Sequence, residues 1–99
     1  MAKGYWIGHV DISDMEEYKK YVAGNAKAFA KYGGRFLARG GQFENPEGSC
    51  RSRHVIIEFD SYQQALDCYN SEEYQSVIPI RARESVSVGD FIILEGYEG

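Results

Sequence analysis

Apolar residues gather in short runs, which are separated by two longer stretches where apolar residues recur every three or four positions. The runs at residues 5–10, 55–59 and 91–95 consist mainly of residues that favour strands. The middle run contains one charge, Glu58, and is otherwise apolar at neighbouring positions, which is typical of a strand buried on both faces. Residues 35–39 follow a glycine pair and predict a further strand.

The first longer stretch predicts a helix with one buried face. Asp14 and Glu17 have the spacing of a capping box, in which the first side chain accepts a hydrogen bond from the backbone of the second. The apolar positions behind this box are Met15, Tyr18, Val22, Ala26 and Phe29. Gly33 and Gly34 end the predicted helix, because glycine readily takes the backbone conformation of a helix terminus.

The second longer stretch predicts a helix that begins at Ser61, whose partner in a capping box is Gln64. Its apolar stripe consists of Tyr62, Ala65, Leu66 and Tyr69. Ser71 begins another capped turn. We expect Pro79 to break or kink that turn, because proline lacks the backbone N–H that a helix interior requires.

These elements follow the order strand, helix, strand, strand, helix, strand, which is the β-α-β-β-α-β arrangement of an α+β, ferredoxin-like fold. We predict a four-stranded antiparallel sheet in the spatial order 4-1-3-2, with both helices on one face and residues 1–99 forming a single domain. The other face would expose the apolar strands at 55–57 and 91–94. A second copy of the chain is the simplest cover, so we expect a homodimer closed through this face.

Composition narrows the range of partners. The chain is 43% hydrophobic and 26% charged with a net charge of −4, which is typical of a globular protein and unlike a disordered tail. Lysines and arginines form no basic cluster, so we expect no nucleic-acid partner. No apolar run approaches the roughly 20 residues that span a bilayer, and residues 1–10 lack the pattern of a signal peptide. We therefore expect a cytoplasmic protein without a membrane partner.

Common cofactor and catalytic motifs are absent from the sequence. The chain has no phosphate-binding loop, no dinucleotide-binding glycine pattern and no H-E-x-x-H motif, so we expect no cofactor. Cys50 and Cys68 have neither the spacing of a zinc site nor the context of a secreted protein. We expect both cysteines to be free thiols.

One segment is similar to a known family. Residues 58–75 have the pattern EF-x-S-x-x-x-A-x-x-x-Y-x-S-x-x-Y-Q, and with it the chain resembles the domain-of-unknown-function family 1330 nearly from end to end. The other matching positions are Asp14, Tyr18, Arg39, Gly40, Gly41 and Arg81. Met15 and Asp60 stand where the family often has proline, and Cys68 stands where a tryptophan is common.

The resemblance implies two ferredoxin-like subunits whose sheets face each other and close a dimeric α/β barrel. It implies no activity for this chain, because the family has none assigned. Wider relatives with the same barrel include cofactor-independent monooxygenases, lactone isomerases and haem-degrading proteins. The fold alone does not choose among these functions.

The first candidate site lies on the helix-free face. If the first and third strands pair with His9 opposite His54, then Tyr5 lies opposite Glu58 on the same face. Arg35 and Arg39 join them if Phe36 and Ala38 of the second strand point toward the helices. Such a group could serve acid–base chemistry or bind an anionic organic molecule, or it could be a set of ion pairs that fixes the register. The histidines and the carboxylate lack tight ligand spacing, so we expect no metal.

Glu58 needs a partner, because an isolated buried charge is costly. We expect Arg39 as the first choice to bind this carboxylate, with Arg35, Arg81 or a histidine next. We also expect the resulting group to border whatever cavity the protein has.

The second candidate site lies between the sheet and the helices, where Tyr69, Tyr74 and Arg81 come from the region at and after the second helix. Their hydroxyl and guanidinium groups could bind a phenolate or a carboxylate. The alternative is that the tyrosines are core aromatics, Tyr69 above all, and that Arg81 pairs with Glu72 or Glu73.

Two functions remain open. One is an enzyme without a cofactor that acts on a small aromatic or carboxylate-bearing metabolite by proton transfer or oxygenation. The other is a non-catalytic dimer that binds a metabolite or a partner protein. An enclosed pocket in which the candidate side chains converge favours the first, whereas side chains that pair off and leave no room favour the second.

Overall fold

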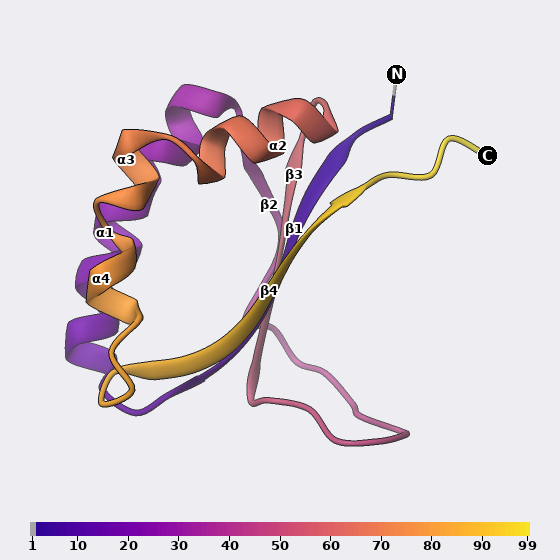
Figure 1. Ribbon diagram of the computed structural model, residues 1–99. Coiled ribbons are helices and arrows are strands. Elements are labelled where there is room, and N and C mark those ends of the chain that lie inside the picture. The colour runs from indigo at the N-terminus through magenta and orange to yellow at the C-terminus, as the bar shows by residue number, and fades with distance from the viewer. Residues whose placement is uncertain (1) are drawn as a thin grey trace.

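The computed structural model describes residues 2–99, and its elements follow the predicted order (Figure 1). The strands are β1 (Gly4–Ile12), β2 (Arg35–Arg39), β3 (Arg53–Phe59) and β4 (Ser87–Glu95). The helices are α1 (Met15–Tyr32), α2 (Tyr62–Tyr69), α3 (Glu72–Gln75) and α4 (Ile78–Arg81). Neighbouring strands are antiparallel and the sheet order is β2-β3-β1-β4, which confirms the predicted α+β, ferredoxin-like topology.

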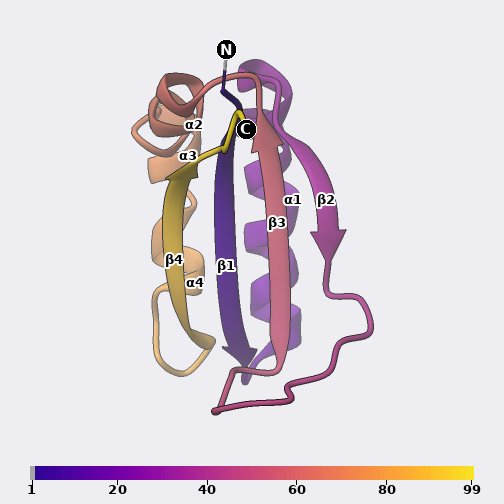
Figure 2. The same cartoon turned by 90° about the vertical axis from the view of Figure 1, so that its right-hand side faces the viewer.

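The helices form one layer that covers a single face of the sheet (Figure 1). Within residues 2–99 the opposite face carries no helix, and the strands lie side by side across it (Figure 2). The two ends of the chain meet at one end of the sheet, where the Gly96 backbone N–H donates to the Lys3 carbonyl oxygen at 2.7 Å. In the part of the chain that is described, no helix is long and apolar enough to cross a membrane.

The predicted caps define the starts of three helices. The side chains of Asp14, Ser61 and Ser71 accept hydrogen bonds from the backbone N–H three residues later, at 3.1 to 3.2 Å. Each cap satisfies a backbone donor that has no partner inside its helix. α1 ends where Gly33 takes the left-handed conformation, with φ of 73°. Pro79 lies in the first turn of α4, and the helical segment is broken into α3 and α4 as expected.

Trp6 lies at the centre of the core. Its side chain is fully buried, and its ring packs against several aromatic rings at centroid distances of 4.8 to 5.3 Å. These rings belong to Phe29, Phe59, Tyr74 and Phe91. The indole N–H donates to the Ala65 carbonyl oxygen at 2.9 Å, so the polar atom of the ring is also paired. One side chain therefore joins three strands to the helical layer.

The buried side of α1 differs from the predicted stripe. Tyr18 and Phe29 are buried as expected, but Met15 and Ala26 are exposed. The other buried positions are Tyr21, Asn25 and Ala28. α1 packs against α2, α3 and α4, so its buried side is wider than one apolar stripe and is turned toward those helices.

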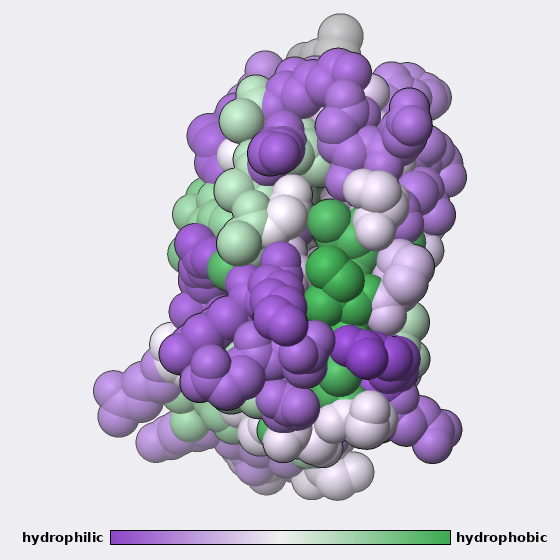
Figure 3. Space-filling model, turned by 90° about the vertical axis from the view of Figure 1, so that its left-hand side faces the viewer, coloured by the Kyte–Doolittle hydropathy of each residue, from purple (hydrophilic) through white to green (hydrophobic). Residues whose placement is uncertain are grey.

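The outward side of the helical layer is mostly hydrophilic, with a narrow band of hydrophobic side chains near its centre (Figure 3). Charged side chains of α1 lie exposed on the solvent side: they are Glu16, Lys19, Lys20 and Lys27. This distribution agrees with a helix that buries one side and solvates the other.

Two strands are longer than predicted. β1 continues to Ile12 and β4 begins at Ser87, and the added residues pair with one another in the antiparallel ladder. Gly89 and Asp90 hide this part of β4 in the sequence, because both residue types are poor strand formers.

Candidate functional site

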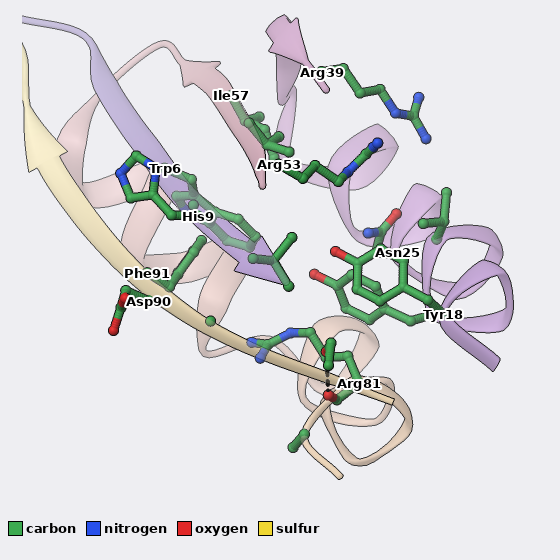
Figure 4. A pocket seen from close by; sticks show the side chains of 18 of the residues that line it. Trp6, His9, Tyr18, Asn25, Arg39, Arg53, Ile57, Arg81, Asp90 and Phe91 are labelled. Carbon is green, nitrogen blue, oxygen red and sulfur yellow. Dashed lines mark hydrogen bonds between the residues drawn. The ribbon is translucent and has the colours of Figure 1, made fainter. Parts of the chain in front are cut away.

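A cavity of about 330 Å³ lies between the sheet and the helical layer. Its apolar wall includes Trp6, Phe29, Val55, Ile57 and Phe91. Polar side chains close other parts of the wall (Figure 4). They include Tyr18, Tyr21, Asn25, Arg39, Arg53, Tyr74 and Arg81. Apolar walls with a small number of polar groups at fixed positions are typical of small-molecule sites.

Tyr74 joins two other cavity residues in a hydrogen-bonded chain. The hydroxyl oxygens of Tyr21 and Tyr74 lie 2.7 Å apart, and Arg81 donates to the Tyr74 hydroxyl from Nη2 at 3.1 Å and from Nε at 3.3 Å. The Tyr74 side chain is fully buried, and this burial raises the pKa of its phenol. Tyr74 therefore stays neutral, so it can donate a hydrogen bond but does not serve as a base.

A bulge in β2 turns Arg39 toward the cavity. The pairing of β2 with β3 shifts between Phe36 and Ala38. Beyond the shift Arg39 pairs with Val55, which faces the helices, and its guanidinium lies 4.2 Å from the centroid of the Phe36 ring. The expectation that Arg39 lies on the helix-free face is wrong, because the bulge reverses the alternation of side chains along the strand.

Several polar residues of the cavity were not among the candidates from the sequence; they include Tyr21, Asn25, Arg53 and Glu84. Arg53 begins β3, and its Nε atom is buried without a hydrogen-bond partner. Asn25 is 6% exposed and forms no hydrogen bond with any described residue. Alternation along β3 could have placed Arg53 on the side of Val55, and helical spacing could have placed Asn25 on the side of Tyr18.

The helix-free face has the pairing that the sequence predicts. Tyr5 lies opposite Glu58, and His9 lies opposite His54. The Tyr5 hydroxyl donates to one oxygen of Glu58 at 3.1 Å, and Arg35 donates from Nη2 to the other oxygen at 2.9 Å. The Arg35 guanidinium holds the pKa of the Glu58 carboxyl below its usual range. The Nδ1 atoms of the two histidines lie 2.7 Å apart, so one ring donates a hydrogen bond to the other.

Glu58 therefore has a partner, but not the first one expected. Arg35, rather than Arg39, binds the carboxylate, and Glu58 does not border the cavity because the cavity lies on the other side of the sheet. His9 borders the cavity where β1 passes it, but its imidazole points away (Figure 4). Candidate residues thus form pairs on the helix-free face: they are Tyr5, His9, His54 and Glu58.

The three residues of the second candidate site do not all line the cavity. Tyr74 and Arg81 line the cavity, whereas Tyr69 is a half-buried residue that packs into the aromatic core. The alternative in which Arg81 pairs with an acidic residue of α3 is wrong. Lys31 binds Glu73 at 2.7 Å, and Arg81 donates to a phenol oxygen instead. Among residues 2–99, no group of three or more His, Cys, Asp or Glu residues is arranged to hold a metal ion.

These features define a class of protein: a ferredoxin-like α+β fold with a ligand-sized cavity between its sheet and its helices. The chain belongs to the family described as a domain of unknown function (DUF1330), which matches residues 3–97. The resemblance seen in the sequence is therefore confirmed. A comparison with the curated proteins finds no match.

Solved structures share the fold. A protein of unknown function from Rhodopseudomonas palustris has a TM-score of 0.75 and 18% identity, over 99% of this chain and 85% of that chain. SnoaB, a cofactor-independent oxygenase from Streptomyces nogalater, has a TM-score of 0.63 and 9% identity, over 100% of this chain and 97% of its own. A dimeric protein of unknown function from Bacteroides fragilis has a TM-score of 0.53 and 19% identity, over 94% and 95% of the two chains. At these identities the likeness shows the fold alone.

Proposed function

We propose that the protein binds a small aromatic or carboxylate-bearing metabolite in the cavity and acts on it without a cofactor, by proton transfer or oxygenation. The observation that carries this proposal is the chain of Tyr21, Tyr74 and Arg81 beside an apolar cavity of about 330 Å³. Ligand sites commonly measure roughly 300–1,000 Å³, so this cavity suits a small molecule. Its aromatic wall suits a flat ring, and its polar chain suits an oxygen atom on that ring.

The polar chain favours a reaction in which negative charge develops on an oxygen atom. Proton abstraction and cofactor-free oxygenation both pass through a deprotonated substrate, whose charge rests on an enolate or phenolate oxygen. The neutral phenol of Tyr74 and the guanidinium of Arg81 stabilise such an oxygen by donating hydrogen bonds. Glu84 lines the same cavity without an ion pair to any described residue, and we assign it the role of the base.

A ligand screen followed by measurement of turnover tests this function. For a compound that is converted, we expect Tyr74→Phe to lower the rate about 100-fold, because the substitution removes a donor to the developing charge. Tyr69→Phe is the matched control, since it makes the same change on a ring that does not line the cavity. Product detection by mass spectrometry gives the rates. Equal rates for the two variants would contradict the assigned role of Tyr74.

We also propose a cytoplasmic homodimer that closes through the helix-free face. Ile92 and Leu94 on this face are 53% and 49% exposed, which leaves apolar surface without cover in one chain. The Bacteroides fragilis protein of the same fold is dimeric. A stable interface here would bury on the order of 1,200 Å² or more in total. The unpaired thiols of Cys50 and Cys68 suit the reducing cytoplasm.

The alternative function is a dimer that binds a metabolite without changing it. The observation that favours this function is the pairing of Glu58, His9 and His54 on the helix-free face, which leaves none of them as a base in the cavity. A ligand that binds in the cavity and is recovered unchanged, both with and without oxygen, would establish this alternative in place of the enzyme.

A further inference from the structure

The arginines of the chain divide into two groups. One group lies outside the cavity, and each member donates to a carboxylate at 2.9 to 3.0 Å; its members are Arg35, Arg51 and Arg83. The other group lines the cavity, and none of its members forms an ion pair with a described residue; its members are Arg39, Arg53 and Arg81. The lining also holds two carboxylates, Glu84 and Asp90, and Arg51 from outside the cavity already binds Asp90. The cavity therefore keeps an excess of positive charge, although the net charge of the protein is −4.

Arg39 and Arg53 come from the neighbouring strands β2 and β3, and neither donates a hydrogen bond to a described residue. The Arg53 guanidinium packs against the backbone of Gly40, where any side chain would collide with Nη1, and Arg53 Nε is buried without a partner. Arg39 lies over the Phe36 ring. Arg39 is exposed, so its guanidinium is open to an acceptor from solution. A buried N–H donor without a partner is rare and costs free energy, so Arg53 Nε lacks an acceptor.

Asn25 adds a further polar group to the cavity wall. Its side chain is 6% exposed, lines the cavity and forms no hydrogen bond with a described residue. Figure 4 shows its amide beside Tyr18, facing the space between α1 and the strands. The amide nitrogen and oxygen are not sealed off from solvent, so they open onto the cavity and can bind a polar group of a ligand.

All three arginines of the cavity influence the pKa of the Tyr18 phenol. Burial raises the pKa of the Tyr18 phenol, while the positive charges of Arg53, Arg81 and Arg39 act in the opposite direction. In Figure 4, Arg39 and Arg53 lie on one side of the cavity and Arg81 lies on the other. An anion between them interacts with all three charges.

We propose that the ligand carries a carboxylate, which Arg39 and Arg53 bind with help from Asn25, and an oxygen atom at its other end, which Tyr74 and Arg81 bind. This inference rests on the proposed function, because it takes the cavity as the ligand site. A guanidinium matches a carboxylate through parallel N–H donors. A planar carboxylate conjugated to a ring also continues the flat shape that the aromatic wall accepts. The substrate class is therefore a hydroxy- or oxo-substituted aromatic or unsaturated acid.

The test compares 4-hydroxybenzoate with 4-hydroxybenzamide, which has the same shape but no charge. Isothermal titration calorimetry on the full chain at pH 7 gives both affinities. We expect the acid to bind at least about tenfold more tightly than the amide, and we expect this preference to shrink at high salt. Arg53→Gln and Arg39→Gln should each reduce the preference about tenfold. Arg83→Gln removes an arginine outside the cavity and should leave the preference unchanged.

Each other outcome overturns a defined part of the inference. Equal affinities of acid and amide for the unmodified protein would overturn the carboxylate while leaving the cavity as the ligand site. Failure of the acid, the amide and phenol alike to bind would overturn the proposed function as well. A third outcome is that inorganic phosphate binds, that Arg53→Gln abolishes this binding, and that the acid is not preferred over the amide. The ligand would then carry a phosphate in place of the proposed carboxylate. The unmodified protein decides between acid and amide, so a variant that fails to fold does not weaken the test.

Discussion

The two faces of the sheet are incomplete in opposite ways. On the helix-free face most polar groups bind one another: Tyr5 and Arg35 bind Glu58, and His9 pairs with His54. The exception is His54 Nε2, which is buried without a hydrogen-bond partner. The apolar side chains of that face stand open to water. On the helix-covered face the apolar side chains pack around Trp6, whereas Arg53 and Asn25 form no side-chain hydrogen bond with a described residue.

This difference indicates the kind of partner that each face lacks. Exposed Ile92 and Leu94 need a broad apolar surface, which a second sheet provides. Unpaired Arg53 and Asn25 need a small polar group in a confined space, which a ligand provides. One sheet can therefore serve assembly with one face and binding with the other, and substitutions should separate the two roles.

Trp6→Ala should have the largest effect, because it removes the ring on which the helix-covered face is packed. We expect a loss of about 3–5 kcal/mol in the free energy of unfolding, measured by urea denaturation. Tyr97→Ala is the control, since Tyr97 is 95% exposed and its removal should change little. A loss below about 1 kcal/mol for Trp6→Ala would show that this face does not hold the fold together.

Ile92→Asp tests the helix-free face by placing a charge in its apolar surface. We expect the dimer dissociation constant to rise about 100-fold or more, because an interface buries an unpaired carboxylate at high cost. Light scattering at micromolar concentration measures the change. Met15→Asp is the control on the helical side, where Met15 is 48% exposed at the start of α1. A monomeric unmodified protein would contradict the proposed dimer.

Glu58→Gln separates a structural ion pair from a functional one. Arg35 lowers the pKa of the Glu58 carboxyl in the folded state. The charged carboxylate therefore stabilises the fold fully at pH values above the unfolded pKa of about 4.3. This stabilisation is lost as the pH falls through the folded pKa. We expect the variant to be less stable at pH 7 and the gap to close in acid, with ligand affinity in the cavity unchanged. Urea denaturation at several pH values measures the gap. A gap that is independent of pH, or a loss of ligand binding, would contradict this separation.

The cysteines should give the smallest effect, on reactivity rather than on stability. Burial raises the pKa of the Cys68 thiol to about 12, whereas Cys50 is exposed in the loop between β2 and β3. We expect a thiol reagent to modify Cys50 in the folded protein and both residues after denaturation, without prior reduction. A mass lower by two hydrogens in the unreduced protein would reveal a disulfide and contradict this prediction.

The topology and the register of β1 with β3 were predictable because both depend on local patterns. Caps at Asp14, Ser61 and Ser71 fix where helices begin, and the alternation of Trp6 and its neighbours fixes which side chains face the helices. The same alternation placed Tyr5 opposite Glu58. Such patterns are read from neighbours in the sequence, so they need no knowledge of long-range packing.

The cavity was only partly predictable. Tyr74 and Arg81 were expected there, but Arg39 was assigned to the wrong face because a bulge leaves no clear mark in five residues of an edge strand. Asn25 was missed because a polar residue does not count toward an apolar stripe, although burial of such a residue is the stronger sign of a site. The pairing of charges depends on distances between elements, which the sequence alone does not contain.

Trp6 is the single tryptophan of the chain, and it both borders the cavity and lies fully buried. Fluorescence that is excited at wavelengths absorbed by tryptophan but not by tyrosine therefore comes from one known position. A molecule that enters the cavity changes the surroundings of that indole directly, whereas assembly through the other face leaves them largely unchanged. The protein thus carries its own optical reporter of cavity occupancy, which allows ligands to be screened without a label.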